Sequence, residues 1–144
     1  MTSWPLLKIG NLEVNLIQGG MGVGISGEGL ASEVAENGGA GIIASVGLGL
    51  LKGYFHVEFE SAMKRGDFNG LDAKERRNLQ NKIYANSNSD ALADEIRKAR
   101  KKTNGVIGVN IMHALTDYPS LVKSAVKENA DLIIYGAGIA RDLP

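Results

Sequence analysis

The fold of this chain is decided by the stretch Asn15-Leu-Ile-Gln-Gly-Gly-Met-Gly-Val-Gly-Ile-Ser-Gly27. A short apolar strand leads into five glycines within nine residues, and a helix is expected to follow. Glycine lets backbone N–H groups approach a ligand closely, and the N-terminus of a helix favours negative charge. The stretch therefore predicts a cofactor or phosphate site at the point where a strand ends and a helix begins.

Apolar runs elsewhere in the chain place this stretch in an α/β fold. Buried strands are predicted at residues 14–18, 40–46, 106–112 and 131–135. Each is nearly continuous in Val, Ile and Leu, which is typical of parallel strands covered on both faces. Helices are predicted between them, at about residues 26–36, 90–101 and 119–129. Strands that alternate with helices predict a parallel sheet with right-handed crossovers.

The segment of residues 47–87 interrupts the alternation and is expected to be an insertion after the second strand. Asp72 and Glu75 have the spacing of a capping box, which predicts the start of a further helix there. An insertion at the carboxyl end of a parallel strand lies on the ligand side of such folds. A lid, an oligomer contact and simple packing over the rim of the sheet are all open as its role.

Composition narrows the functional class. The chain has 144 residues, enough for one domain or one piece of a larger one, and its 16 basic residues balance 16 acidic ones. This balance gives no electrostatic footprint for nucleic acid. The absence of cysteine removes disulfides, thiolate catalysis and cysteine metal sites, and no metal site is predicted. No apolar run approaches the ~20 residues that span a bilayer, and the first residues do not resemble a secretory signal, so a cytoplasmic protein without membrane contact is expected.

The glycine run matches two nucleotide-binding motifs only superficially. Gly22-Val-Gly24-Ile-Ser-Gly27 fits the pattern G-x-G-x-x-G. A dinucleotide site also needs an acidic residue near the end of the next strand, and residues 42–47 read Ile-Ile-Ala-Ser-Val-Gly instead. No Gly-Lys-Ser/Thr follows the glycines, so the P-loop pattern fails as well. A tight turn with close helix packing is the remaining structural explanation of these glycines.

The ends of the later strands point to a ligand on the same edge of the sheet. Asn110 is a polar residue late in an otherwise apolar strand, and it is either a satisfied core amide or a hydrogen-bond partner for a flat heterocycle. The fourth strand ends in Gly136-Ala-Gly138, where a ligand can approach the backbone. Ligand groups at the carboxyl ends of successive parallel strands are the arrangement of a (β/α)8 TIM barrel.

Five segments in this order resemble the nitronate monooxygenase family, formerly called 2-nitropropane dioxygenase, which includes the flavin-type enoyl-ACP reductases. They are residues 18–26 (Gln-Gly-Gly-Met-Gly-Val-Gly-Ile-Ser), 36–43 (Glu-Asn-Gly-Gly-Ala-Gly-Ile-Ile), 108–112 (Gly-Val-Asn-Ile-Met), 116–119 (Thr-Asp-Tyr-Pro) and 136–138 (Gly-Ala-Gly). The resemblance covers nearly the whole chain. It departs from the family at residues 139–141, where a Pro-containing turn is common, and in the length of the insertion.

Members of this family are FMN-dependent (β/α)8 barrels. The resemblance implies that the backbone at Gly20, Met21 and Gly22 touches the flavin ring and that the side chain of Asn110 hydrogen-bonds it. Gly136, Ala137 and Gly138 would line the same face on the substrate side.

A whole barrel needs ~250 residues, so the chain is expected to supply the first four strands, the N-terminal half of the barrel. In the family the catalytic histidine follows the fifth strand, and the loops after the seventh and eighth strands hold the FMN phosphate. No catalytic residue is therefore assigned within the chain. Neither His56 nor His113 matches the family's histidine motif, and His113 is interpreted as a rim residue.

The resemblance implies part of an oxidoreductase that oxidises alkyl nitronates or nitroalkanes with O₂. A flavin-dependent enoyl-ACP reductase and a non-catalytic half-barrel that serves binding or assembly are the alternatives. Alone, the chain is expected to be inactive and to bind FMN weakly or not at all. Because a half barrel leaves unpaired strand edges, either self-association or pairing with a missing C-terminal half is expected.

Overall fold

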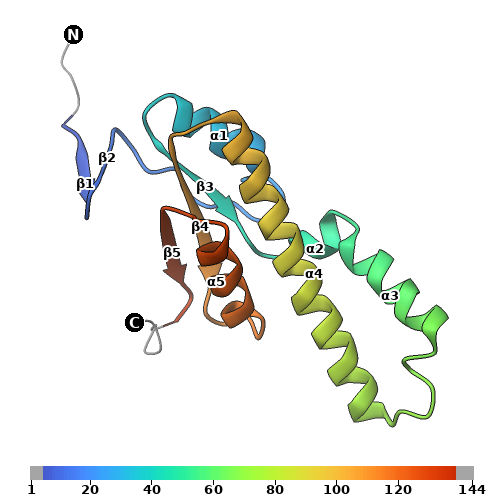
Figure 1. Ribbon diagram of the computed structural model, residues 1–144. Coiled ribbons are helices and arrows are strands. Elements are labelled where there is room, and N and C mark those ends of the chain that lie inside the picture. Colours follow the sequence, from blue (N-terminus) through green and yellow to red (C-terminus); the bar gives the residue numbers. More distant parts are fainter. Residues whose placement is uncertain (1–4, 139–144) are drawn as a thin grey trace.

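The computed structural model describes residues 5–138 as a parallel sheet with helices packed on one of its faces (Figure 1). Three strands follow one another in chain order across the sheet: β3 (Ala40–Ala44), β4 (Val106–Met112) and β5 (Leu132–Gly136). Asn110 of β4 is paired with Ala44 on one side and with Ile134 on the other. These strands confirm three of the four predicted from apolar runs, with ends that differ by at most two residues.

The first predicted strand, at residues 14–18, is divided between two partners. β1 (Leu7–Ile9) and β2 (Leu12–Val14) form an antiparallel hairpin that the sequence analysis did not predict. The chain then turns at Asn15 and runs beside β3, where Ile17 forms a single parallel bridge with Ala40. The segment is short because the glycine run begins at Gly19 and leaves no residues to continue the ladder.

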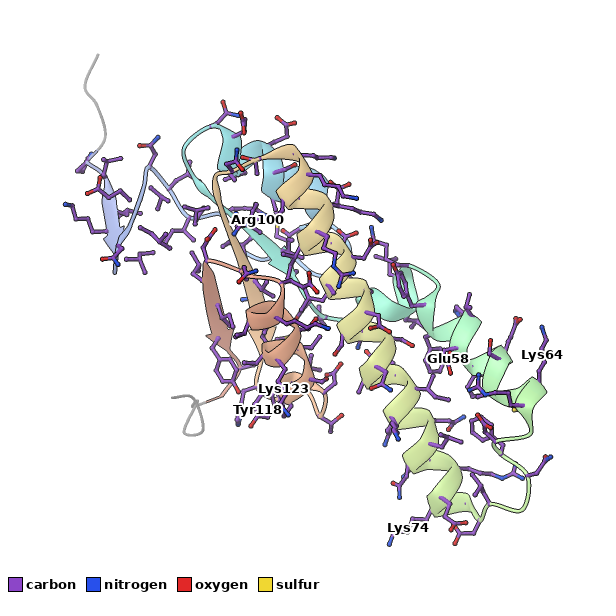
Figure 2. All side chains as sticks on the ribbon, viewed as in Figure 1. Glu58, Lys64, Lys74, Arg100, Tyr118 and Lys123 are labelled. Carbon is purple, nitrogen blue, oxygen red and sulfur yellow. The ribbon has the colours of Figure 1, made fainter. Side chains whose placement is uncertain are left out.

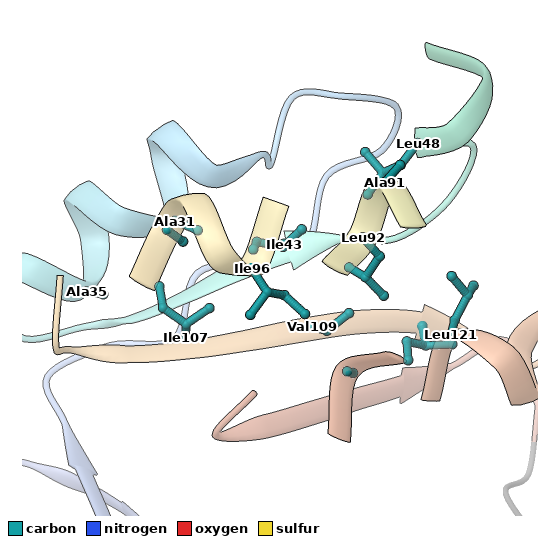
Figure 3. Packing of buried hydrophobic residues seen from close by; sticks show 13 residues of the cluster. Ala31, Ala35, Ile43, Leu48, Ala91, Leu92, Ile96, Ile107, Val109 and Leu121 are labelled. Carbon is teal, nitrogen blue, oxygen red and sulfur yellow. The ribbon is translucent and has the colours of Figure 1, made fainter. Parts of the chain in front are cut away.

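Three helices cover the same face of this sheet: α1 (Glu28–Glu36), α4 (Ala73–Lys102) and α5 (Tyr118–Lys127). Ala31 of α1, Leu92 of α4 and Leu121 of α5 belong to one buried cluster, into which the sheet contributes Ile43, Ile107, Val109 and Ile111 (Figure 3). A doubly wound dinucleotide-binding sheet carries helices on both faces. Strands in chain order with their crossover helices on one face are the arrangement of a singly wound sheet.

The prediction of α4 was wrong in one respect. Two helices were expected, one starting near Asp72 and one over residues 90–101, but the chain forms a single helix of 30 residues. Its start is as predicted: Asp72 accepts hydrogen bonds from the backbone N–H groups of Lys74 and Glu75, and the carboxylate of Glu75 accepts one from the N–H of Asp72. The sequence offers Asn88 or Ser89 as the N-cap of a helix starting near residue 90, yet both lie within α4. The insertion therefore has no boundary at residue 87.

The buried faces of two helices also differ from those that the spacing of apolar residues predicts. The predicted faces are Leu30, Ala31, Val34 and Ala35 in the first helix, and Leu121, Val122, Ala125 and Val126 in the helix at residues 119–129. In α1 the inward residues are Ala31, Ser32 and Ala35, whereas Leu30 keeps 39% of its surface exposed. In α5 Val126 was expected to be buried and is 63% exposed. The alanines face inward because α1 packs closely on β3: a Cβ at Gly41 would lie 1.8 Å from the carbonyl oxygen of Ala31.

The insertion forms a helical hairpin that projects from the sheet (Figure 1). It contains α2 (Leu48–Leu51), α3 (Tyr54–Arg65) and the first half of α4. Phe55 and Phe59 of α3 stack at 5.5 Å between ring centres, and Phe68 and Ile83 are buried beside them. Charged side chains such as Glu58, Lys64 and Lys74 extend from this hairpin into solvent (Figure 2). In the described part of the chain, no helix combines the length and apolar character needed to cross a membrane.

Basic residues at the end of α4 are paired with carboxylates of neighbouring elements. Arg97 binds Glu128, Arg100 binds Asp131 at 2.6 Å, and Lys102 binds Glu28 at 2.7 Å. The guanidinium of Arg97 hydrogen-bonds Glu128 and thereby holds the pKa of that carboxyl below its usual range. Arg100 also donates to the backbone oxygens of Gly105, just before β4, and of Asn129, in the turn before β5. These contacts fix the helix layer to the ends of the strands.

Candidate functional site

The two faces of β4 have different roles. Ile107, Val109 and Ile111 point toward the helices, so the alternation of a strand places Gly108 and Asn110 on the opposite, inner face. A Cβ at Gly108 would meet Ile42 at 2.7 Å and Leu132 at 2.8 Å, which confirms that these residues share the inner face. A second apolar cluster there contains Val14, Ala40 and Ile42, with the half-buried Val106, Leu132 and Ile134 packed against it.

Asn110 lies against the glycine run on this inner face. A Cβ at Gly20 would be 2.5 Å from Cβ of Asn110 and 3.0 Å from its Cγ, so no side chain fits between the loop and the amide. The backbone carbonyl of Asn110 already has partners: it accepts hydrogen bonds from the N–H and the hydroxyl of Ser45, at 3.1 Å and 2.9 Å. Its half-buried carboxamide has no hydrogen-bond partner within residues 5–138. The satisfied core amide is therefore not what the structure shows.

Gln18 and Ser26 hold the glycine run in place, and the sequence analysis missed both. The fully buried hydroxyl of Ser26 accepts from the N–H of Met21 at 2.9 Å and from Nε2 of Gln18 at 2.8 Å. Gln18 also accepts from the N–H of Ile42 at 3.2 Å. The signal that could have found them is the polar residue at each end of the glycine run. Such residues can hydrogen-bond the loop backbone and hold it in one conformation.

The later glycines of the run make room for the segment that follows β3. A Cβ at Gly22 would be 2.7 Å from Cγ1 of Val46, and one at Gly24 would be 2.2 Å from Cδ2 of Leu51. Gly24 also has a φ of +76°, which favours glycine. The tight-turn explanation thus accounts for Gly22 and Gly24, whereas Gly20 makes its close approach to Asn110.

The N-terminus of α1, where the glycine run alone allowed either a cofactor or a phosphate, is occupied by a side chain of this protein. Oε2 of Glu95 accepts a hydrogen bond from the N–H of Glu28 at 2.8 Å, and a Cβ at Gly27 would lie 2.8 Å from the same oxygen. Oε1 of Glu95 forms an ion pair with Lys52 at 2.8 Å. A helix N-terminus that already carries a carboxylate does not attract a second anion. Of the two ligands that the glycine run alone left open, a phosphate does not fit this helix end, whereas a cofactor ring on the other side of the run stays a prediction.

Gly136 is the last residue of β5 and is paired with Met112 of β4. It lies two residues after Ile134, the partner of Asn110, and therefore on the same inner face. A Cβ there would meet nothing within 4 Å. The chain then passes through Ala137, with a φ of +56°, and the exposed Gly138. Within residues 5–138, nothing occupies the space beside Gly136 on this face.

His113 lies on the other side of the sheet from Asn110. Its Nδ1 hydrogen-bonds the hydroxyl of Tyr135, whose side chain packs against the helix-facing cluster. Its ring is 4.8 Å from the ring of Tyr118 at the start of α5. This placement agrees with the interpretation of His113 as a rim residue.

Metal sites and grooves elsewhere in the described residues are the other candidates for a site. No group of three His, Cys, Asp or Glu side chains in residues 5–138 has the arrangement of a metal site. A groove of about 640 Å³ runs between α3 and α4, and its wall includes Tyr54, Leu79 and Ile83 but neither Gly20 nor Asn110.

The nitronate monooxygenase family model matches residues 5–137, which include the glycine run, Asn110 and Gly136. The chain belongs to the nitronate monooxygenase family. That family consists of FMN-dependent oxidoreductases. No curated protein sequence matches the chain.

Solved structures of larger proteins share this fold. FabK from Thermotoga maritima is 23% identical with a TM-score of 0.55, and the match covers 90% of this chain and 29% of FabK. An IMP dehydrogenase/GMP reductase-like protein from Corynebacterium glutamicum is 16% identical with a TM-score of 0.54, over 98% of this chain and 38% of that protein. The chain therefore spans about a third of the length of these structures. At these identities the likeness concerns the α/β fold with its parallel sheet.

Proposed function

We propose that this nitronate monooxygenase-family chain forms one wall of an FMN site, on which the flavin ring is oriented for the oxidation of alkyl nitronates or nitroalkanes with O₂. The observation that carries the proposal is the carboxamide of Asn110. It is half-buried, lies beside a backbone that approaches it without a side chain, and has no partner within residues 5–138. A primary amide offers one acceptor and two donors, which suits the alternating polar edge of a flavin.

The glycine run contributes its backbone in a specific way. The N–H of Met21 donates to Ser26 and its carbonyl accepts from the N–H of Ser26, so we expect Met21 to touch the ring by packing only. No described residue accepts a hydrogen bond from the N–H of Gly20 or Gly22. These two N–H groups are therefore the donors we assign to the ring. Gln18 and Ser26 orient them because they fix the turn.

Bound FMN supplies the redox chemistry, and the protein supplies orientation and hydrogen bonds. Asn110 would hold the polar edge of the ring, while Gly136, Ala137 and Gly138 leave space on the substrate side. The apolar inner face below, with Ile42, Val106 and Leu132, would exclude water from one end of the site. Because the α1 N-terminus is filled by Glu95, we assign the FMN phosphate to loops outside this set of residues.

We further propose that the chain is the N-terminal half of a (β/α)8 barrel. Support comes from the singly wound order of the segment at Ile17, β3, β4 and β5, with all crossover helices on one face. Such a half would need four more strands, from a second copy or from a C-terminal half. The hairpin of α2, α3 and α4 would then stand at the rim.

Self-association is the expected result for the chain alone. No described strand pairs with the outer edge of β5, and apolar side chains of the inner face, such as Leu132 and Ile134, are only half-buried. Gel filtration should give a mass above the 15.3 kDa monomer. Ile134→Lys on the inner face should shift it toward the monomer, and Lys123→Ala on the outer α5 should not. A clean wild-type monomer would contradict this prediction.

The flavin wall is tested by titrating the chain with riboflavin and with FMN. We expect weak binding of both, with dissociation constants of about 100 µM or weaker. The two constants should agree within about threefold, because none of the described residues is assigned to the FMN phosphate. Asn110→Ala should weaken riboflavin binding by about tenfold through loss of its hydrogen bonds, and Asn86→Ala on the exposed side of α4 should have no effect. Equal binding by the Asn110 variant would refute the proposed wall.

The chain alone should turn over neither an alkyl nitronate with O₂ nor an enoyl thioester with a nicotinamide. The physical reason is that none of the described residues on the inner face is assigned to proton transfer, since the resemblance places the family's histidine after a fifth barrel strand. Steady-state assays with both substrates measure this directly. Tight, stoichiometric FMN together with nitronate turnover would show that the residues described here form a complete site, and enoyl reduction would favour the reductase alternative.

A further inference from the structure

Glu95 is a buried charged residue that the proposed flavin wall does not use. It projects from the last third of α4, retains 1% of its surface, and approaches the first turn of α1. Burial of a carboxylate destabilises the folded state unless the carboxylate is paired and hydrogen-bonded. Here the ammonium of Lys52 and the N–H of Glu28 provide both compensations, each at 2.8 Å.

Glu95 replaces a cap that α1 lacks in its own sequence. The N-cap residue is Gly27, and no side chain caps the helix locally. Ser, Thr, Asp or Asn is preferred at this position, but a Cβ there would collide with Oε2 of Glu95. The last glycine of the run is therefore explained by the carboxylate that reaches in from α4. The side chain of Glu28 points elsewhere and pairs with Lys102.

This contact is coupled to the glycine run through one residue. Ser26 precedes Gly27, and its hydroxyl and N–H hold both polar groups of the Met21 backbone. A displacement of Gly27 and Glu28 would move Ser26, and with it the segment that places Gly20 against Asn110. Lys52, which follows α2, extends the coupling to the base of the helical hairpin.

We propose that Glu95 is a positioning residue for the glycine run. Its carboxylate acts as an internal anion at the N-terminus of α1, holds Ser26 and Gly20 in the conformation that faces Asn110, and prevents phosphate from binding there. The use of that conformation for a flavin ring rests on the proposed function, whereas the positioning itself does not.

The first experiment measures amide hydrogen exchange in Glu95→Gln and in the control Glu28→Gln. Both variants remove one negative charge at the same helix end, but only the first alters the cap. In Glu95→Gln the amides of Met21, Ser26 and Glu28 should exchange about tenfold faster, while those of Ile43 and Val109 in the sheet should be unchanged. Glu28→Gln should leave all five unchanged. Equal acceleration in the run and the sheet, or none in the run, would overturn the proposal.

The second experiment uses Glu95→Ala, which leaves Lys52 and the N–H of Glu28 facing a vacant space. Acetate or inorganic phosphate should restore slow exchange at Met21 and Ser26, and neutral acetamide should not. Failure of both anions would show that Glu95 does not act as an anion. If Glu95→Ala does not fold, the comparison of the two glutamine variants decides alone. Neither experiment contains flavin, so their failure is distinguishable from failure of the proposed flavin wall.

Discussion

Gly41→Ala should destabilise the chain by about 3 kcal/mol or more, because it places a methyl group inside the backbone of α1. The new Cβ would lie 1.8 Å from the carbonyl oxygen of Ala31 and 2.5 Å from its carbonyl carbon. Neither atom can rotate away, so α1 would have to move off β3. The free energy of unfolding in urea measures the effect.

Gly29→Ala is the matched control, since Gly29 lies in the same helix layer and a Cβ there meets nothing within 4 Å. Alanine in a helix should raise stability by about 1 kcal/mol. A loss below about 1 kcal/mol in the Gly41 variant would mean that α1 and β3 are packed less closely than described.

Asn88→Ala should have the second large effect, again about 3 kcal/mol, because it leaves two buried groups without partners. The side chain of Asn88 accepts from the N–H of Gly49 at 2.8 Å and donates to Asp117 at 2.7 Å. It thereby links α2, α4 and the N-terminus of α5. Asp117 is itself buried, and its other oxygen has no described partner.

Two variants separate this network from α4 as a helix. Asn86→Ala, two residues away on the exposed side, should change stability by no more than about 0.5 kcal/mol. Asn88→Asp should be as damaging as the alanine variant at neutral pH, since it faces one carboxylate with another. Equal stability of wild type and Asn88→Ala would show that these hydrogen bonds do not contribute to the free energy of unfolding. Chemical denaturation with fluorescence or circular dichroism detection distinguishes these outcomes.

The strands of the sheet could be predicted from sequence because both of their faces are apolar. One face packs against the helices, and the other carries the second cluster of Val14, Ala40 and Ile42. The continuity of α4 could not be predicted. Residues 86–90 read Asn-Ser-Asn-Ser-Asp, a composition of poor helix formers that is typical of a loop or a cap. Tertiary contacts reverse that preference, because Ser87 and Asn88 are buried and Asn88 bonds α2 and α5.

The candidate site also has a part that could be predicted from the sequence and a part that could not. The approach of Gly20 to Asn110 follows from strand order and the alternation of faces, both of which can be read from the sequence. Glu95 could not be predicted, because it lies 67 residues from the helix end it caps and its own surroundings in the sequence are those of a charged helix face. The local motif therefore left a phosphate open at a helix end that the side chain of Glu95 occupies in the fold.

The most direct test of the central claim is to map the contact of riboflavin on the isotope-labelled chain by amide chemical shifts. We predict saturable shifts at the backbone of Gly20 and Gly22 and at the side-chain amide of Asn110, with none at Glu28. Shifts confined to the groove between α3 and α4, for example at Tyr54 and Ile83, or centred on Glu28, would contradict the claim that this inner face is the wall of a flavin site.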